Sequence, residues 1–202
     1  MRALLALSRF IDAVSRAVGR VVMWLTLLVV LISAGNAVAR KLFHASSNAW
    51  LEIQWYLFGA IFMLGAGYAL LRNDHVRVDI LASRFSQRTQ LWIEIIGVVA
   101  FLLPFAGLLM WLGWPMAWNA FETHEQSTST GGLIRWPVKL LIPVGFALLL
   151  LAGLSHLIKC VACLRGLAPD PRLAGAEPNV PAPPEPVAAA VPARASDREP
   201  TA

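Results

Sequence analysis

The sequence predicts an all-α integral membrane protein with four membrane-spanning helices, and two observations carry that prediction. Of the 202 residues, 57% are hydrophobic and only 14% are charged, which is too apolar for an ordinary soluble domain. Four apolar runs are also long enough, at about 1.5 Å per helical residue, to cross a hydrocarbon layer of about 30 Å. The net charge of +5 does not indicate nucleic-acid binding, because the arginines lie beside the apolar runs and not in a basic face with interleaved aromatics.

The first 20 residues have the periodicity of an amphipathic helix that lies in the membrane surface. Four apolar residues fall on one helical face and four charged residues on another: Leu7, Ile11, Val14 and Val18 against Arg9, Asp12, Arg16 and Arg20. A disordered basic leader is the alternative for this segment. The first span follows at about residues 21–39. A secretory signal cleaved after Ala39 is disfavoured, because such signals usually total about 15 to 30 residues.

The second span, about residues 49–71, is broken only by Glu52 and Gln54 near its start. Small and adaptable side chains follow one stripe of this helix, which suits close helix packing. The stripe consists of Glu52, Tyr56, Gly59, Met63 and Ala66. It is therefore a candidate packing seam, either structural or between subunits.

The third span, about residues 91–116, carries Pro104 in its middle, and the missing backbone donor there predicts a kink. The fourth span, about residues 138–158, begins beside Lys139. Glu52 and Lys139 are expected at similar depth near the same interface, so they are hypothesised to form ion pairs within the chain or with a partner. The alternative is that each side chain reaches the lipid headgroups independently.

Both termini are predicted to be cytoplasmic, because Lys and Arg flank the spans unequally. Eleven lie in the amino-terminal segment, in the connector after the second span and just after the fourth span, whereas four lie on the opposite side. The other two connections then face the periplasm or exterior. A disordered Pro/Ala-rich cytoplasmic tail is expected over residues 166–202, after a membrane domain of residues 21–165, because nine of the chain's 13 prolines lie in that tail.

Residues that could carry chemistry are sparse. His156, Cys160 and Cys163 share a helical face near the end of the fourth span, but two reduced thiols and an interfacial histidine explain them without a metal. No histidine pair inside the spans suits haem, and no catalytic triad or phosphate-binding glycine loop is present. The sequence therefore predicts no enzyme activity, no cofactor and no metal.

The centres of the four spans carry no charge; they lie near Val30, Ala60, Leu103 and Leu148. A transporter of ions or carboxylates usually has ionisable residues or discontinuous helices near the bilayer midplane, because the substrate must be compensated there. The sequence thus argues against a complete transport path through this chain alone.

Two stretches, WLEIQWYLFGAIFMLGAGYALLRNDHVRVDIL and STGGLIRWPVKLLIPVGFALLLLAGL, resemble the small permease subunit of tripartite ATP-independent periplasmic (TRAP) transporters. The resemblance covers about residues 21–164. It rests on Glu52, on a segment just after the second span and on a segment that opens the fourth. The residues concerned are Asp74, His75, Arg77 and Asp79 in the first segment, and Gly131, Gly132, Trp136, Pro137, Lys139, Pro143 and Gly145 in the second.

In this family a soluble periplasmic solute-binding protein captures a small organic anion, often a carboxylate, and a large permease subunit moves it with a sodium gradient. The resemblance implies that this chain is a four-span scaffold in the bacterial inner membrane, with the large permease subunit, the binding protein and membrane lipid as partners. The segment after the second span would hold the cytoplasmic membrane edge. Two other interpretations stay open: a membrane anchor of a respiratory or redox complex, and an independent oligomeric channel or exporter.

Overall fold

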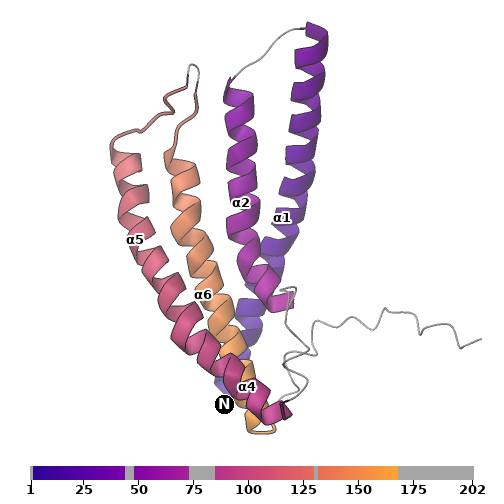
Figure 1. Cartoon of the computed structure of the whole chain (residues 1–202), viewed down its shortest axis with the longest axis vertical. Coiled ribbons are helices and arrows are strands. Elements are labelled where there is room, and N and C mark those ends of the chain that lie inside the picture. The colour runs from indigo at the N-terminus through magenta and orange to yellow at the C-terminus, as the bar shows by residue number, and fades with distance from the viewer. Residues whose placement is uncertain (1, 44–47, 73–84, 130–131, 168–202) are drawn as a thin grey trace, which may run out of the picture.

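The computed structural model describes residues 2–43, 48–72, 85–129 and 132–167, and these are built mainly from helices (Figure 1). The elements are α1 (Arg2–Phe43), α2 (Asn48–Arg72), α4 (Gln87–Gly97), the π-helical turn η1 (Val98–Leu102), α5 (Leu103–Glu122) and α6 (Trp136–Leu164). Because α4, η1 and α5 follow one another without a gap, the described residues form four long apolar helices that are able to cross a membrane. The predicted all-α, four-span fold class is confirmed.

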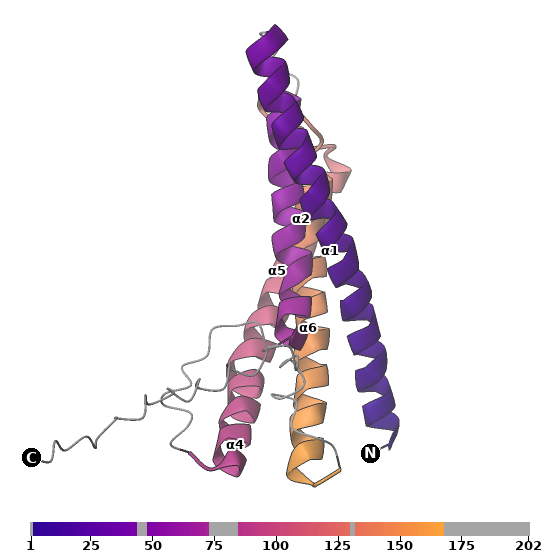
Figure 2. The ribbon, with the colours of Figure 1, turned by 90° about the vertical axis from the view of Figure 1, so that its right-hand side faces the viewer.

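The four helices run up and down, and α6 lies at the centre of their contacts. It packs against α1, α2, α4 and α5. Among the remaining described long helices, α1 and α2 pack against each other. Figure 1 shows that α1 begins and α6 ends at one end of the bundle, here called the terminal end. The opposite end, where α2 begins and α5 ends, is called the hairpin end. Figure 2 shows the same helices from the side, with α1 inclined across the others.

The amino-terminal segment is helical, as expected, but it continues into the first span as one helix of 42 residues. No proline separates the two parts, so the helix continues from one into the other. At about 1.5 Å per residue α1 is roughly twice as long as a hydrocarbon layer of about 30 Å. Arg9, Arg16 and Arg20 are exposed, as expected for a polar face, but Asp12 is buried against α6.

The irregularity expected at Pro104 takes the form of a π-helical turn that ends two residues before it. In η1 the backbone N–H of Leu103 donates to the carbonyl of Val98, five residues back, and Pro104 then occupies the first turn of α5. Proline has no backbone N–H to continue the ladder, and a local π adjustment is one way in which a membrane helix accommodates it. The third helix is also longer than expected, extending from residue 87 to residue 122.

Glycines allow the closest approaches between helices. A Cβ added at Gly145 of α6 would lie 2.8 Å from both the Cβ and the carbonyl oxygen of Met63 in α2. One added at Gly67 of α2 would lie 3.1 Å from the carbonyl oxygen of Leu148 in α6. Helix association in lipid depends on such close contacts, because lipid tails are as apolar as leucine and give no hydrophobic driving force.

The stripe predicted on α2 therefore lies, in part, against α6 of the same chain. Met63 contacts Gly145, and a Cβ added at Gly59 would meet the Cγ2 of Val138 at 3.7 Å. Tyr56 and Ala66 are half-buried. The small side chains serve packing within the chain at these positions, and a contact with another subunit through the stripe stays a prediction.

We predict that Gly145→Ala lowers the thermal stability of the purified chain. The added methyl group overlaps backbone and side-chain atoms of Met63, and overpacking of this kind costs about 1–3 kcal/mol, against a gain in helix propensity of up to about 1 kcal/mol. The melting temperature in detergent measures the effect. Gly107→Ala in α5 is the matched control, because nothing lies within 4 Å of its added Cβ. A melting temperature for Gly145→Ala at or above that of the wild type would contradict the packing argument.

Candidate functional site

Charged side chains that join different segments of the described structure gather at the two ends of the bundle. At the hairpin end a cluster joins α2 to the loop that precedes α6. At the terminal end two clusters join α6 to α1 and to α4. Each cluster is built around side chains that would be costly to leave unpaired inside a bilayer.

Glu52 holds the loop of residues 123–135 against the start of α2. Its carboxylate accepts a hydrogen bond from the Ser127 hydroxyl and another, 2.7 Å long, from the backbone N–H of Leu133. The loop closes on itself at the same place, since the Ser127 N–H donates to the Leu133 carbonyl at 3.0 Å. One carboxylate at the end of a membrane helix thus fixes two points of the loop.

The hypothesised ion pair between Glu52 and Lys139 within the chain is wrong, because each residue has other partners. A pairing of either residue with a partner subunit stays a prediction. Lys139 pairs with Glu125, whose carboxylate also lies 3.6 Å from Arg135. The hydrogen bond from Lys139 is the main reason that the pKa of Glu125 lies below its usual value. Similar depth in the membrane was not enough to bring Glu52 and Lys139 together, because the loop places its own carboxylate beside the lysine.

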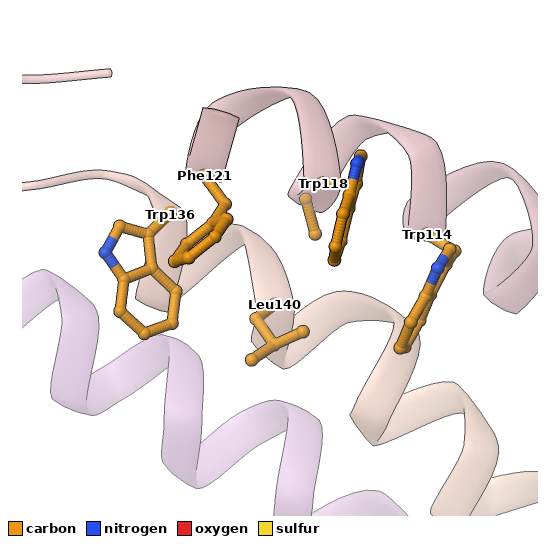
Figure 3. Close-up of a pocket in the computed structure, with 6 residues that line it drawn as sticks. Trp114, Trp118, Phe121, Trp136 and Leu140 are labelled. Carbon is orange, nitrogen blue, oxygen red and sulfur yellow. The ribbon is translucent and has the colours of Figure 1, made fainter. Parts of the chain in front are cut away.

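An apolar pocket of about 170 Å³ opens between α5 and α6 at the hairpin end (Figure 3). It is lined by Trp114, Ala117, Trp118 and Phe121 of α5 and by Trp136 and Leu140 of α6. The Phe121 and Trp136 rings meet edge to face, with centroids 5.5 Å apart. Tryptophans at this level suit a membrane–water interface, since their rings have an apolar body and a polar N–H. The exposed Trp118 ring illustrates this, donating its N–H to Glu122 at 2.7 Å.

The first cluster of the terminal end joins α1 to α6. Asp12 accepts a hydrogen bond of 2.6 Å from the Ser155 hydroxyl and forms an ion pair of 2.6 Å with Lys159. The Ser155 and Ser8 hydroxyls are 2.8 Å apart and share a further hydrogen bond. The sequence predicts that this helix turns its charged residues toward water, but Asp12 is buried because it pairs with Lys159.

The second cluster of the terminal end joins α4 to α6. The Nε2 atom of His156 lies 2.9 Å from a carboxylate oxygen of Glu94, and the Cys160 thiol donates to the same oxygen at 3.7 Å. His156 and Cys160 are buried, whereas Glu94 is partly exposed. Of the three residues on the predicted face, the structure brings His156 and Cys160 together with Glu94, whereas Cys163 is half-exposed and outside the cluster.

The remaining predicted positions divide into two groups. Trp136 and Pro137 begin α6, and both Pro143 and Gly145 are buried in its first half. Gly132 lies in the loop, packed against Ser127. Asp74, His75, Arg77, Asp79 and Gly131 lie outside the described residues, as does the tail from residue 168. The predicted roles of that second group stay predictions.

The sequence interpretation missed several partners, among them Ser127 and Glu94. Ser127 belongs to a Ser/Thr run whose spacing singles out no member, and it is 75 residues from Glu52. Glu94 is 62 residues from His156. The sequence places an acidic residue near the end of one span and a histidine near the end of another. Many rotations of the two helices about their axes are compatible with that placement, so it does not predict the contact.

Comparison with known proteins gave one match. A family model described as tripartite ATP-independent periplasmic transporters, DctQ component, matches residues 29–163, which is about two thirds of the chain. Searches of curated proteins and of solved structures returned no match.

We predict that Glu52→Gln loosens the loop of residues 123–135. The substitution removes the charge and replaces one of two accepting oxygens by an amide nitrogen, so either Ser127 or the Leu133 N–H loses its acceptor. Hydrogen exchange read by mass spectrometry should show faster exchange at Leu133 and its neighbours. Glu122→Gln is the matched control, because its carboxylate bonds to Trp118 within α5. Unchanged loop exchange in Glu52→Gln would contradict the assigned role.

Proposed function

The chain belongs to the DctQ family, the small permease component of tripartite ATP-independent periplasmic (TRAP) transporters, and on that premise we propose that it is a scaffold for the large permease subunit. Transporters of this class combine a small and a large membrane component with a separate binding protein. In the proposed complex the large subunit moves a small organic acid with a sodium gradient, and a periplasmic binding protein delivers it. This chain braces the large subunit and contributes no part of the substrate path.

The uncharged middle of the bundle is the observation that carries the scaffold proposal. Within the described helices, the charged side chains with partners in other segments lie toward the ends: Glu52 and Lys139 toward the hairpin end, and Asp12, Glu94, His156 and Lys159 toward the terminal end. Arg20, near the middle of the long α1, is exposed on the outside of the bundle. The helical irregularity in the described spans is a π turn that joins α4 to α5 without a break. An organic anion crossing such a middle would find no compensating charge or exposed helix end.

The flanks of the bundle supply surface for partners that are themselves apolar. Trp55 and Phe62 on α2, Phe101 on η1 and Trp111 on α5 each leave about three quarters of their surface exposed. Side chains of this size are stable in that position only against lipid tails or another apolar protein surface. Their exposure supports a chain that is embedded in lipid and in contact with a second membrane subunit.

We further propose that the hairpin end faces the periplasm and the terminal end the cytoplasm. The excess of Lys and Arg at the terminal end and its connections supports this orientation in the bacterial inner membrane. The loop of residues 123–135 would then face the binding protein. Its bonds to Glu52 and Lys139 would present it in one conformation, which reduces the ordering required when a partner docks.

The scaffold proposal predicts that organic-acid uptake depends on this chain although the chain alone transports nothing. Uptake of a labelled acid is measured in proteoliposomes that contain the cognate large subunit and binding protein, with and without this chain. We expect uptake driven by a sodium gradient with the chain, and background uptake without it or when potassium replaces sodium.

Three results would contradict this function. Full uptake without the chain would show that no scaffold is required, provided that equal amounts of the large subunit are present. Uptake by the chain alone would favour an independent channel or exporter. Haem or quinone that co-purifies in fixed stoichiometry would favour a redox anchor.

The orientation proposal predicts which residues a membrane-impermeant maleimide reaches. In a background that lacks Cys160 and Cys163, we expect Thr128→Cys in the loop to be labelled in intact spheroplasts. Arg9→Cys in α1 should be labelled only after lysis. Both positions are exposed in the structure, so burial within the chain does not explain a difference between them. The reverse pattern would overturn the proposed orientation and leave the scaffold role untouched.

A further inference from the structure

The cluster of Glu94, His156 and Cys160 is left unused by the scaffold function. One potential ligand atom from each residue lies within 4.8 Å of the other two. Two of the residues are four positions apart on α6, so successive turns of one helix present their side chains to the same side. The third comes from α4, which makes the cluster a contact between two helices.

The spacing of the donor atoms is close to that of a tetrahedral zinc site. Zinc bonds of about 2.0–2.3 Å to oxygen, nitrogen and sulfur place neighbouring ligand atoms roughly 3.3–3.8 Å apart. In the structure the carboxylate oxygen of Glu94 lies 2.9 Å from the Nε2 of His156 and 3.7 Å from the Sγ of Cys160. Side-chain rotations that move these atoms by less than about 1 Å would surround an ion.

The charge balance of the cluster also favours a divalent cation. A carboxylate, a thiolate and a neutral imidazole carry two negative charges, so a doubly charged ion would give a neutral site. Neutrality matters here, because His156 and Cys160 are buried and an uncompensated charge among membrane helices is expensive. The mixture of sulfur, nitrogen and oxygen ligands selects zinc and similar transition metals over magnesium or calcium, which prefer oxygen alone.

We propose that Glu94, His156 and Cys160 bind one divalent transition-metal ion of the zinc class and thereby join α4 to α6. On binding, the Cys160 thiol loses its proton to solvent, and His156 coordinates through Nε2 as the neutral ring protonated on Nδ1. The fourth position is taken by water, and the Glu94 side chain, 19% exposed, marks the side from which ion and water enter. This site is independent of the transport role.

Cobalt substitution tests the site in the purified full-length chain in lipid nanodiscs, after treatment with a chelator. A tetrahedral cobalt–thiolate site has intense visible bands and a near-ultraviolet charge-transfer band. We expect both at one cobalt per chain, and zinc should displace them. Cys160→Ser should abolish the charge-transfer band and weaken metal binding by more than about 100-fold, the upper effect of losing an outer-shell partner. Cys163→Ser is the matched control and should keep the band and the affinity.

Several results would overturn the proposal: no thiolate band in the wild type, the same band in Cys160→Ser, or its loss in Cys163→Ser. Glu94→Gln and His156→Gln should also weaken binding, and unchanged affinity in both would be equally decisive. If Cys160→Ser does not yield folded protein, X-ray absorption of the zinc-loaded wild type decides. One sulfur at about 2.3 Å among nitrogen and oxygen neighbours at about 2.0–2.2 Å is expected. A shell without sulfur would refute the site.

Discussion

The close contact between α2 and α6 is the interaction on which the rest of the bundle depends. Apolar helices gain no hydrophobic free energy by leaving lipid to contact each other, so their association depends on close packing that only small residues permit. Gly145 lets α6 reach the backbone of Met63, and Gly67 lets α2 reach the backbone of Leu148. With α6 held in this position, its remaining sides meet α1 and α5. The central place of α6 thus follows from a few positions without side chains.

Polar clusters at both ends of α6 complement that apolar contact. Apolar packing alone allows a helix to slide or rotate by small amounts. A carboxylate that accepts two directed hydrogen bonds restricts both movements. Glu52 fixes the loop before α6, and Asp12 and Glu94 bind the last turns of α6 to α1 and α4. Because each carboxylate has directed partners, the pairing selects the register of the helices as well as satisfying buried charge.

The existence of four apolar helices and an irregularity near Pro104 were predictable from the sequence, but helix lengths and helix partners were not. Apolar length locates a span, and Pro104 has a local consequence that appears as η1. Which side of one helix meets which side of another depends on rotation about both axes, and depth alone does not determine it. Glu52 and Lys139 show this, since the loop supplies Glu125 as the partner of the lysine. Asp12 shows it too, because Lys159 turned an expected surface residue into a buried one. The stripe on α2 was recognisable because its small residues point to close packing without naming the partner.

A scaffold and a transport path place opposite demands on a four-helix bundle. A path requires charge or broken helices at mid-membrane and contacts that exchange as the substrate moves. A scaffold requires contacts that persist, and a seam of glycines closed at both ends by hydrogen-bonded carboxylates is of that kind, since opening either end would leave polar groups without partners. An ion held by Glu94, His156 and Cys160 would strengthen the contact between α4 and α6. The glycine contacts and the polar clusters both hold α6 in place, and a rigidly held central helix is what the proposed bracing role requires.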